Sequence, residues 1–120
     1  MKIQDLSVGN YVWLHKEGTK KIYQIDSGYD LYKLDESDCA DISPIDITEE
    51  ILLKCEEIFK VGEFTFCIDD YITLKIEDND WEDVCVDVFI KGIYITCVTS
   101  LHELQNLFKS IGMNHLTFNL

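Results

Sequence analysis

The strongest constraint on the fold lies between residues 84 and 98, where two apolar segments flank a short turn. The segments VCVDVFI and GIYITCV alternate in side-chain character, and Lys91-Gly92 lies between their apolar positions. A two-residue turn that contains Gly joins the strands of a tight β-hairpin. Side chains alternate between the two faces of such a hairpin, so its turn also predicts which residues share a buried face. The predicted pairs on that face are Ile90 with Ile93, Val88 with Ile95 and Val86 with Cys97.

A second pair of apolar segments precedes this hairpin. EFTFCI and YITLKI flank Asp69-Asp70, and both are rich in β-branched and aromatic residues. Such runs, separated by short polar turns, favour consecutive antiparallel strands. The sequence therefore predicts an antiparallel meander near residues 63–98.

Two helices are predicted around this meander. Thr48 is an N-cap candidate that is followed by two glutamates, and apolar residues recur at helical spacing as far as Phe59. Ser100 and Glu103 have the spacing of a capping box, and Gly112 has the position of a C-terminal stop. The patterns predict one helix near residues 48–60 and a C-terminal helix near residues 100–111.

The first third of the chain has the composition of short strands. Tyr11–His15, Lys20–Ile25 and Asp30–Leu34 are aromatic or β-branched segments, and glycine-containing turns separate them. Their spacing favours a small curled sheet that is SH3-like. Because 120 residues suit one hydrophobic core, we expect a single α+β domain over residues 1–120.

The net charge restricts the possible partners. The chain has 23 acidic and 10 basic residues, a net charge of −13, and every basic residue is Lys. Arginine is the preferred side chain for phosphate recognition, and a strongly negative protein repels polyanions. We therefore expect no direct nucleic-acid binding. The acids are concentrated in two windows, residues 26–50 and residues 69–87.

The cysteines and histidines give no recognisable metal or nucleophile motif. Five cysteines are widely spaced, which favours buried, reduced thiols over a disulfide framework or a zinc knuckle. His102 is expected on the exposed side of the last helix. We predict no catalytic residue, no metal, no cofactor and no enzyme activity. No apolar run approaches the roughly 18 residues of a membrane span, so the expected location is cytoplasmic, with no membrane partner.

Two acidic clusters are the predicted partner-binding residues. The segment EDNDWEDV places a Trp among acids, and Trp is enriched at the energetic centres of protein interfaces. Its acids do not form an EF-hand, since the sixth position lacks Gly and the twelfth is Phe89. Trp81 either packs on the core or anchors a partner. The candidate contact residues are Trp81, Asp78, Asp80, Glu82 and Asp83 in this cluster and Asp35, Glu36, Asp38 and Asp41 in the other.

Three segments carry a resemblance to a known group of proteins. They are MKIQDLSVGNYV at the start, PIDITEEILLKC in the middle and LHELQNLF near the end. Together they resemble small proteins encoded by phages and prophages of Bacteroidetes, most of which have no assigned function. The resemblance implies a phage or prophage setting within a bacterial host.

The charge pattern and this resemblance together favour one function over two alternatives. We expect a non-catalytic inhibitor of the anti-CRISPR type that binds a basic surface on a host nucleic-acid enzyme, such as an RNA-targeting type VI-B effector. Such enzymes hold nucleic acid in positively charged channels. The first alternative is a structural or accessory phage protein that acts through self-assembly or through a phage partner. A small hydrolase is the least favoured reading.

Overall fold

The computed structural model describes residues 1–77, 85–112 and 116–120. The fold is α+β, as predicted, and contains two antiparallel sheets. The chain divides into two compact units, which are described separately. The single domain and the SH3-like topology stay predictions. Within the described ranges, no helix has the length and apolar character that crossing a bilayer requires.

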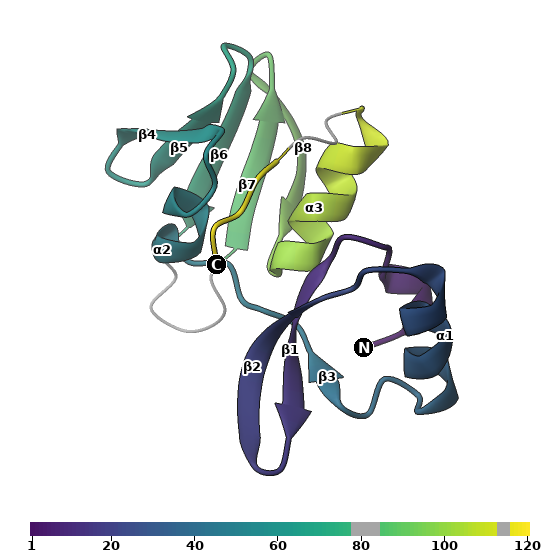
Figure 1. The fold of residues 1–120 in the computed structure, drawn as a ribbon. Helices are drawn as coiled ribbons and strands as arrows, with labels where there is room; N and C mark the ends of the chain where they lie inside the picture. Colours follow the sequence, from purple (N-terminus) through teal and green to yellow (C-terminus); the bar gives the residue numbers. More distant parts are fainter. Residues whose placement is uncertain (78–84, 113–115) are drawn as a thin grey trace. The chain divides into compact units, whose positions relative to one another are not determined.

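The first unit comprises Met1–Ile45 and Ser100–Gly112 and contains a three-stranded sheet. A short 3-10 helix, Ile3–Asp5, precedes β1 (Tyr11–Lys16) and β2 (Thr19–Gln24), and β3 (Ile42–Ser43) pairs with the other side of β1 (Figure 1). Glu17 and Gly18 form the β1–β2 turn with φ values of 53° and 77°. Positive φ at both turn residues is the geometry that matches the twist of a hairpin.

The predicted third strand is a helix, so that prediction is wrong. Residues Gly28–Glu36 form α1, and its N-cap Ser27 accepts a hydrogen bond from the Asp30 backbone N–H. The Asp30 carboxylate in turn accepts one from the Asp26 N–H at 3.0 Å. This local capping outweighs the strand propensity of the aromatic residues. Leu31 and Leu34 then face the core cluster of the unit, which consists of Leu6, Val12, Ile25, Cys39 and Ile42.

The C-terminal helix of the first unit is confirmed as α3 (Leu101–Ser110). It buries Leu101, Leu104 and Phe108 completely, and Gly112 ends it with a φ of 87°. Ser100 is the N-cap, but its hydroxyl donates to the Glu103 carboxylate rather than accepting from a backbone N–H.

A polar network centred on Asn106 connects α3 to the N-terminal segment. The Asn106 side-chain oxygen accepts from the Ser7 hydroxyl at 2.6 Å and from the Asn10 amide at 2.9 Å. Its amide nitrogen donates to the Asp5 carbonyl at 2.9 Å. Asn10 is only 2% exposed, so its polar atoms depend on these partners.

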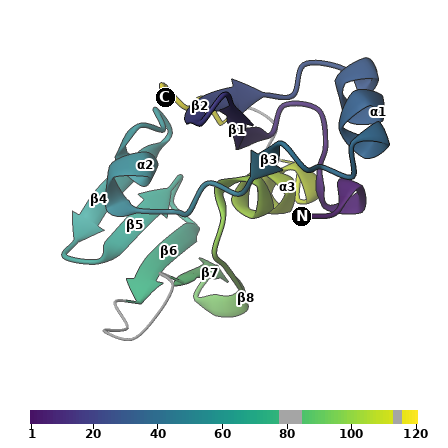
Figure 2. The same ribbon diagram turned by 90° about the horizontal axis from the view of Figure 1, so that it is seen from below.

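The second unit comprises Asp46–Thr99 and Met113–Leu120 and contains the predicted meander. Its five strands are adjacent in chain order from β4 to β8, as Figure 2 shows. The core is apolar, with Phe66, Ile68, Ile72 and Leu74 nearly or fully buried. The strands are β4 (Ile58–Gly62), β5 (Thr65–Ile68), β6 (Ile72–Glu77), β7 (Cys85–Ile90) and β8 (Ile93–Val98).

The helix predicted near residues 48–60 is correct at its start and wrong in its extent. Thr48 caps α2 by accepting from the Ile51 N–H, but α2 covers only Glu49–Leu53. After it, the Lys54 carbonyl accepts from the Asn119 N–H at 2.8 Å, and other backbone groups bond to the same C-terminal segment. Those tertiary hydrogen bonds replace the helical ones, so Phe59 lies in β4 and is 64% exposed.

The predicted β7–β8 register is correct next to the turn and wrong beyond it. Ile90 pairs with Ile93 as expected, but a β-bulge then leaves Ile95 as an extra residue in β8. From there the pairing shifts by one, so that Asp87 rather than Val86 lies opposite Cys97. A one-residue shift moves a side chain to the other face of the sheet. Cys97 is consequently exposed, and Ile93 and Ile95 are exposed as well.

Candidate functional site

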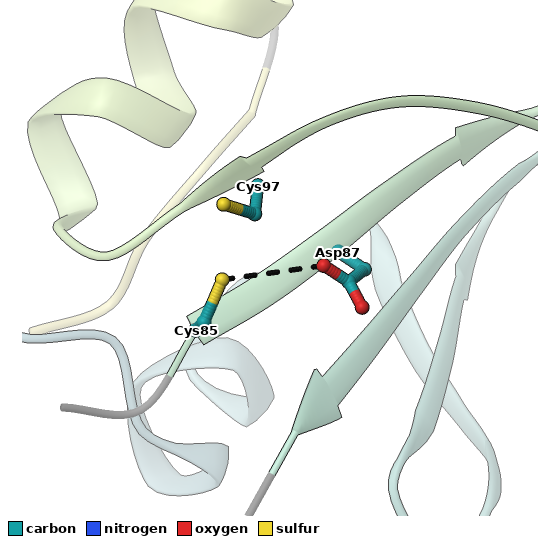
Figure 3. Close-up of side chains that lie close together, drawn as sticks. All are labelled: Cys85, Asp87 and Cys97. Atoms are coloured by element: carbon teal, nitrogen blue, oxygen red, sulfur yellow. Dashed lines mark hydrogen bonds between the residues drawn. The ribbon is translucent and has the colours of Figure 1, made fainter. Parts of the chain in front are cut away.

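The outer face of the β7–β8 hairpin brings two thiols and a carboxylate together. Cys85 and Asp87 lie two residues apart in β7 and therefore point to the same side of the sheet. The bulge places Cys97 of β8 directly opposite Asp87. Figure 3 shows the three side chains, which we call the Cys85–Asp87–Cys97 cluster.

The ligand atoms of this cluster are close to one another. The two sulfur atoms and a carboxylate oxygen all lie within 4.8 Å, and Cys85 Sγ is 4.0 Å from Asp87 Oδ1. Cys85 and Asp87 are half-buried, whereas Cys97 is exposed. Two soft sulfur donors and one hard oxygen donor thus meet on a face that solvent reaches.

Neighbouring side chains contribute both charge and an aromatic surface. Lys75 of β6 is the register partner of Asp87, and its ammonium lies 5.0 Å from the centre of the Phe89 ring. Phe89 contacts Tyr94 edge to face, with ring centres 5.7 Å apart. Desolvation and the neighbouring Cys97, Asp87 and Cys85 raise the pKa of the Tyr94 phenol.

The predicted acidic cluster without Trp81 lies on the surface of the first unit. Asp35, Glu36, Asp38 and Asp41 are all exposed, and they belong to residues 35–41, which we call the acidic turn. Asp38 and Cys39 have positive φ, and Cys39 is buried with its N–H bonded to the Leu34 carbonyl at 2.8 Å. Buried Cys39 therefore fixes the backbone of the turn while the acids face solvent.

The second predicted cluster lies outside the described residues. It consists of Trp81, Asp78, Asp80, Glu82 and Asp83, and the structural description ends at residue 77 and resumes at residue 85. The proposed contact role of this cluster therefore stays a prediction.

The cysteines differ more than the sequence predicted. Cys39 and Cys55 are buried as expected, but Cys67 and Cys85 are half-buried and Cys97 is exposed. Burial raises the pKa of the Cys55 thiol to about 12, and the nearby Glu57 carboxylate adds to this effect. A nucleophilic cysteine needs a lowered pKa. Cys55 therefore has the properties of a structural thiol.

His102 is buried, so the prediction of an exposed position is wrong. It is 5% exposed, and its Nδ1 lies 3.2 Å from the Ser100 hydroxyl. Since the only hydroxyl hydrogen of Ser100 is donated to Glu103, Nδ1 carries a hydrogen that it donates to Ser100. Burial lowers the pKa of His102, more than Glu103 and Asp5 raise it. The Ser–His contact is therefore a polar closure of the first turn of α3.

Sequence reasoning missed the Cys85–Asp87–Cys97 cluster because the bulge is not visible in the alternation pattern. A regular ladder from the same turn would place Cys97 opposite Val86 on the buried face. The available signal was the pair Cys85 and Asp87, which share a face in any register.

Comparison of the chain with known proteins gave no match among family models, curated proteins or solved structures.

Proposed function

We propose that this chain is a non-catalytic binding protein that inhibits a nucleic-acid enzyme of a bacterial host by covering a basic surface. The observation that carries the proposal is the solvent face of α1 and the acidic turn that follows it. There, four exposed carboxylates lie close in sequence to two exposed aromatic side chains. The resemblance to phage and prophage proteins supplies the biological setting.

The aromatic side chains provide the contact area that an interface needs. Tyr29 and Tyr32 are 65% and 58% exposed and lie three residues apart, so they share one side of the helix. Exposed Tyr side chains are common anchors of protein interfaces because they combine apolar area with a polar hydroxyl. They provide an anchor within the described residues, in addition to the one predicted at Trp81.

Hydrogen bonds fix the backbone that carries the carboxylates before any partner binds. Asp38 N–H donates to the Asp35 carbonyl at 3.0 Å, and His15 N–H in β1 donates to the Asp41 carbonyl at 2.7 Å. The acidic turn is therefore attached at one end to α1 and at the other to the sheet. A segment whose backbone is already ordered binds with a smaller loss of conformational entropy than a flexible acidic tail does.

The position of these acids is electrostatically unfavourable for the fold itself. Asp35 and Glu36 lie at the C-terminal end of α1, where the helix dipole is negative, and Lys33 pairs with Glu36 at 3.7 Å. Like charges that crowd a helix C-terminus destabilise it, so their presence favours a role in binding. The same charges would accelerate association with a basic channel.

The test is inhibition of a purified type VI-B effector that cleaves a labelled RNA, with the effector–protein affinity measured at two salt concentrations. We expect binding that weakens as salt rises and a variant with Asp35→Asn, Asp38→Asn and Asp41→Asn that binds at least about tenfold more weakly. The matched control neutralises three exposed acids elsewhere, with Glu17→Gln, Glu50→Gln and Glu63→Gln. Equal loss in both variants would indicate a net-charge effect and contradict the proposed surface.

The exposed apolar residues of the second sheet favour one alternative, self-assembly as a structural or accessory phage protein. Both edge strands carry them, with Phe59 and Val61 each 64% exposed in β4 and Ile93 66% exposed in β8. Exposed apolar edge strands are prone to pair with another chain. Light scattering after size-exclusion chromatography distinguishes the two functions, since a stable large homo-oligomer would favour assembly.

A further inference from the structure

We propose that Cys85, Asp87 and Cys97 form a binding site for one thiophilic divalent cation, with Zn²⁺ as the natural occupant. The site goes beyond the proposed function, which uses a different surface. Its basis is the position of three ligand atoms on the outer face of β7 and β8 (Figure 3).

The donor set selects the metal. Two thiolates and one carboxylate match the ligands of zinc, whereas calcium and magnesium prefer oxygen ligands alone. Zinc bonds of about 2.3 Å to sulfur in a tetrahedral arrangement place two sulfur atoms about 3.8 Å apart. The observed ligand atoms lie within 4.8 Å of one another, so side-chain rotation covers the remaining distance.

The scaffold also suits a metal site. All three ligands come from paired strands, and the backbone pairing of Asp87 with Cys97 fixes the spacing between them. Sites built on strands are held more precisely than sites on loops. The exposed Cys97 gives an ion a route in, and three protein ligands leave a fourth position for water.

The surrounding charges are compatible with an occupied site. Two thiolates and one carboxylate with Zn²⁺ carry a net charge of −1. The Lys75 ammonium over Phe89 is a nearby positive charge, and Lys75 is the register partner of Asp87. Metal binding displaces the thiol protons, so the metal affinity depends on pH.

The register favours a metal over a disulfide between the two cysteines. Asp87 lies directly opposite Cys97, so Cys85 is the diagonal neighbour of Cys97. Diagonal residues of an antiparallel pair lie about 7–8 Å apart. Disulfide-bonded residues have Cα separations of about 4.4–6.8 Å, so bridging this pair would require the backbone to move.

The experiment is calorimetric titration of the intact, reduced chain with Zn²⁺ and absorption spectroscopy with Co²⁺. We expect one ion per chain and a thiolate-to-cobalt charge-transfer band that Zn²⁺ abolishes. Each of Cys85→Ser, Cys97→Ser and Asp87→Asn should weaken binding by more than about 100-fold, since loss of even an outer-shell partner costs roughly 10–100-fold. Thermal unfolding in EDTA checks that each variant folds.

Two controls separate this site from nonspecific binding. Cys67→Ser removes a half-buried thiol from the same sheet, and Glu63→Gln removes an exposed acid, so neither should change the affinity. Zn²⁺ that binds the Cys85→Ser, Cys97→Ser double variant as tightly as the original chain would show adventitious carboxylate binding and overturn the proposal. The absence of the Co²⁺ band, or a Cys85–Cys97 disulfide as the stable form in mass spectrometry under mild reducing conditions, would overturn it too.

Discussion

The two compact units use polar side chains in opposite ways. In the first unit, Asn10, Ser100 and His102 are buried, and each has hydrogen-bond partners that complete the packing of α3. In the second unit the core is apolar, and polar groups such as Asp87 and Cys97 lie on the outer face of the sheet.

Polar groups thus have two different roles in this chain: some complete the packing of the interior, and others are accessible to ligands. A buried group whose hydrogen bonds are complete contributes to a unique packing and has little capacity left for a ligand. Thiols and carboxylates that gather on an accessible face can exchange protons and bind ions. Buried hydrogen bonds are therefore tested in the first unit, and metal binding is tested in the second.

The largest expected effect comes from truncating one fully buried aromatic residue in each unit. Phe108 in the first unit and Phe66 in the second are both 0% exposed. Each Phe→Ala change should lower the free energy of unfolding by about 3–5 kcal/mol through lost contacts and a cavity. Chemical denaturation followed by circular dichroism measures both.

The same pair of variants tests whether the units unfold together. The chain passes between the two units three times. Unfolding of one unit therefore frees the ends of the segments that fold into the other unit. We expect a single transition that both substitutions lower by similar amounts. Two transitions, each sensitive to only one substitution, would contradict the predicted single domain.

A smaller effect is expected from the Asn106 network. Asn106→Ala removes the acceptor for Ser7 and for buried Asn10, and should cost about 1–3 kcal/mol for the polar groups left without it. Ser110→Ala on the same helix removes only an exposed hydroxyl bonded to the Leu107 carbonyl and should stay within about 0.5 kcal/mol. Equal effects in urea denaturation would show that the network contributes nothing specific.

The effects of pH on stability are the smallest near neutral pH, and they have opposite directions in the two units. Burial lowers the pKa of His102, so the unfolded chain binds a proton more readily and stability decreases as pH falls below about 6.5. Burial raises the pKa of Cys55 from 9.0 to about 12, so stability decreases as pH rises through that range. Each slope is at most about 1.4 kcal/mol per pH unit.

Substitutions that remove the titrating group but keep a hydrogen-bonding group show which residue causes each pH dependence of stability. His102→Gln should flatten the acid side of the stability profile, and Cys55→Ser should flatten the alkaline side. Thermal unfolding across pH, compared with the original chain, measures the difference for each group. If neither substitution changes its side of the profile, the two buried groups do not control the pH dependence.

The sequence was most informative where structure is local. The Thr48 cap, the turn before Ile93 and the C-terminal helix all follow from neighbouring residues, and all are confirmed. The wrong prediction of a strand at α1 also had a local cause. Ser27 and Asp30 have the spacing of a helix-capping pair, but the prediction followed the strand propensity of the aromatic residues instead.

Two further errors arose from contacts distant in sequence. The early end of α2 depends on hydrogen bonds to Thr117 and Asn119, which no local pattern reveals. The burial of His102 depends on packing within the first unit. Of the predicted binding residues, the acids of the acidic turn are exposed as an interface requires, and the role of Trp81 stays a prediction.

The bulge in β8 also has a consequence for how this gene can change. Ile95 is one residue more than the ladder needs, so loss of its codon would leave Asp87 opposite the same cysteine in an uninterrupted hairpin. We therefore expect the strand to tolerate the loss of one residue at this position, with the same side chains still meeting on its outer face. In a related chain with one residue fewer between Gly92 and the cysteine, the alignment gap belongs at position 95.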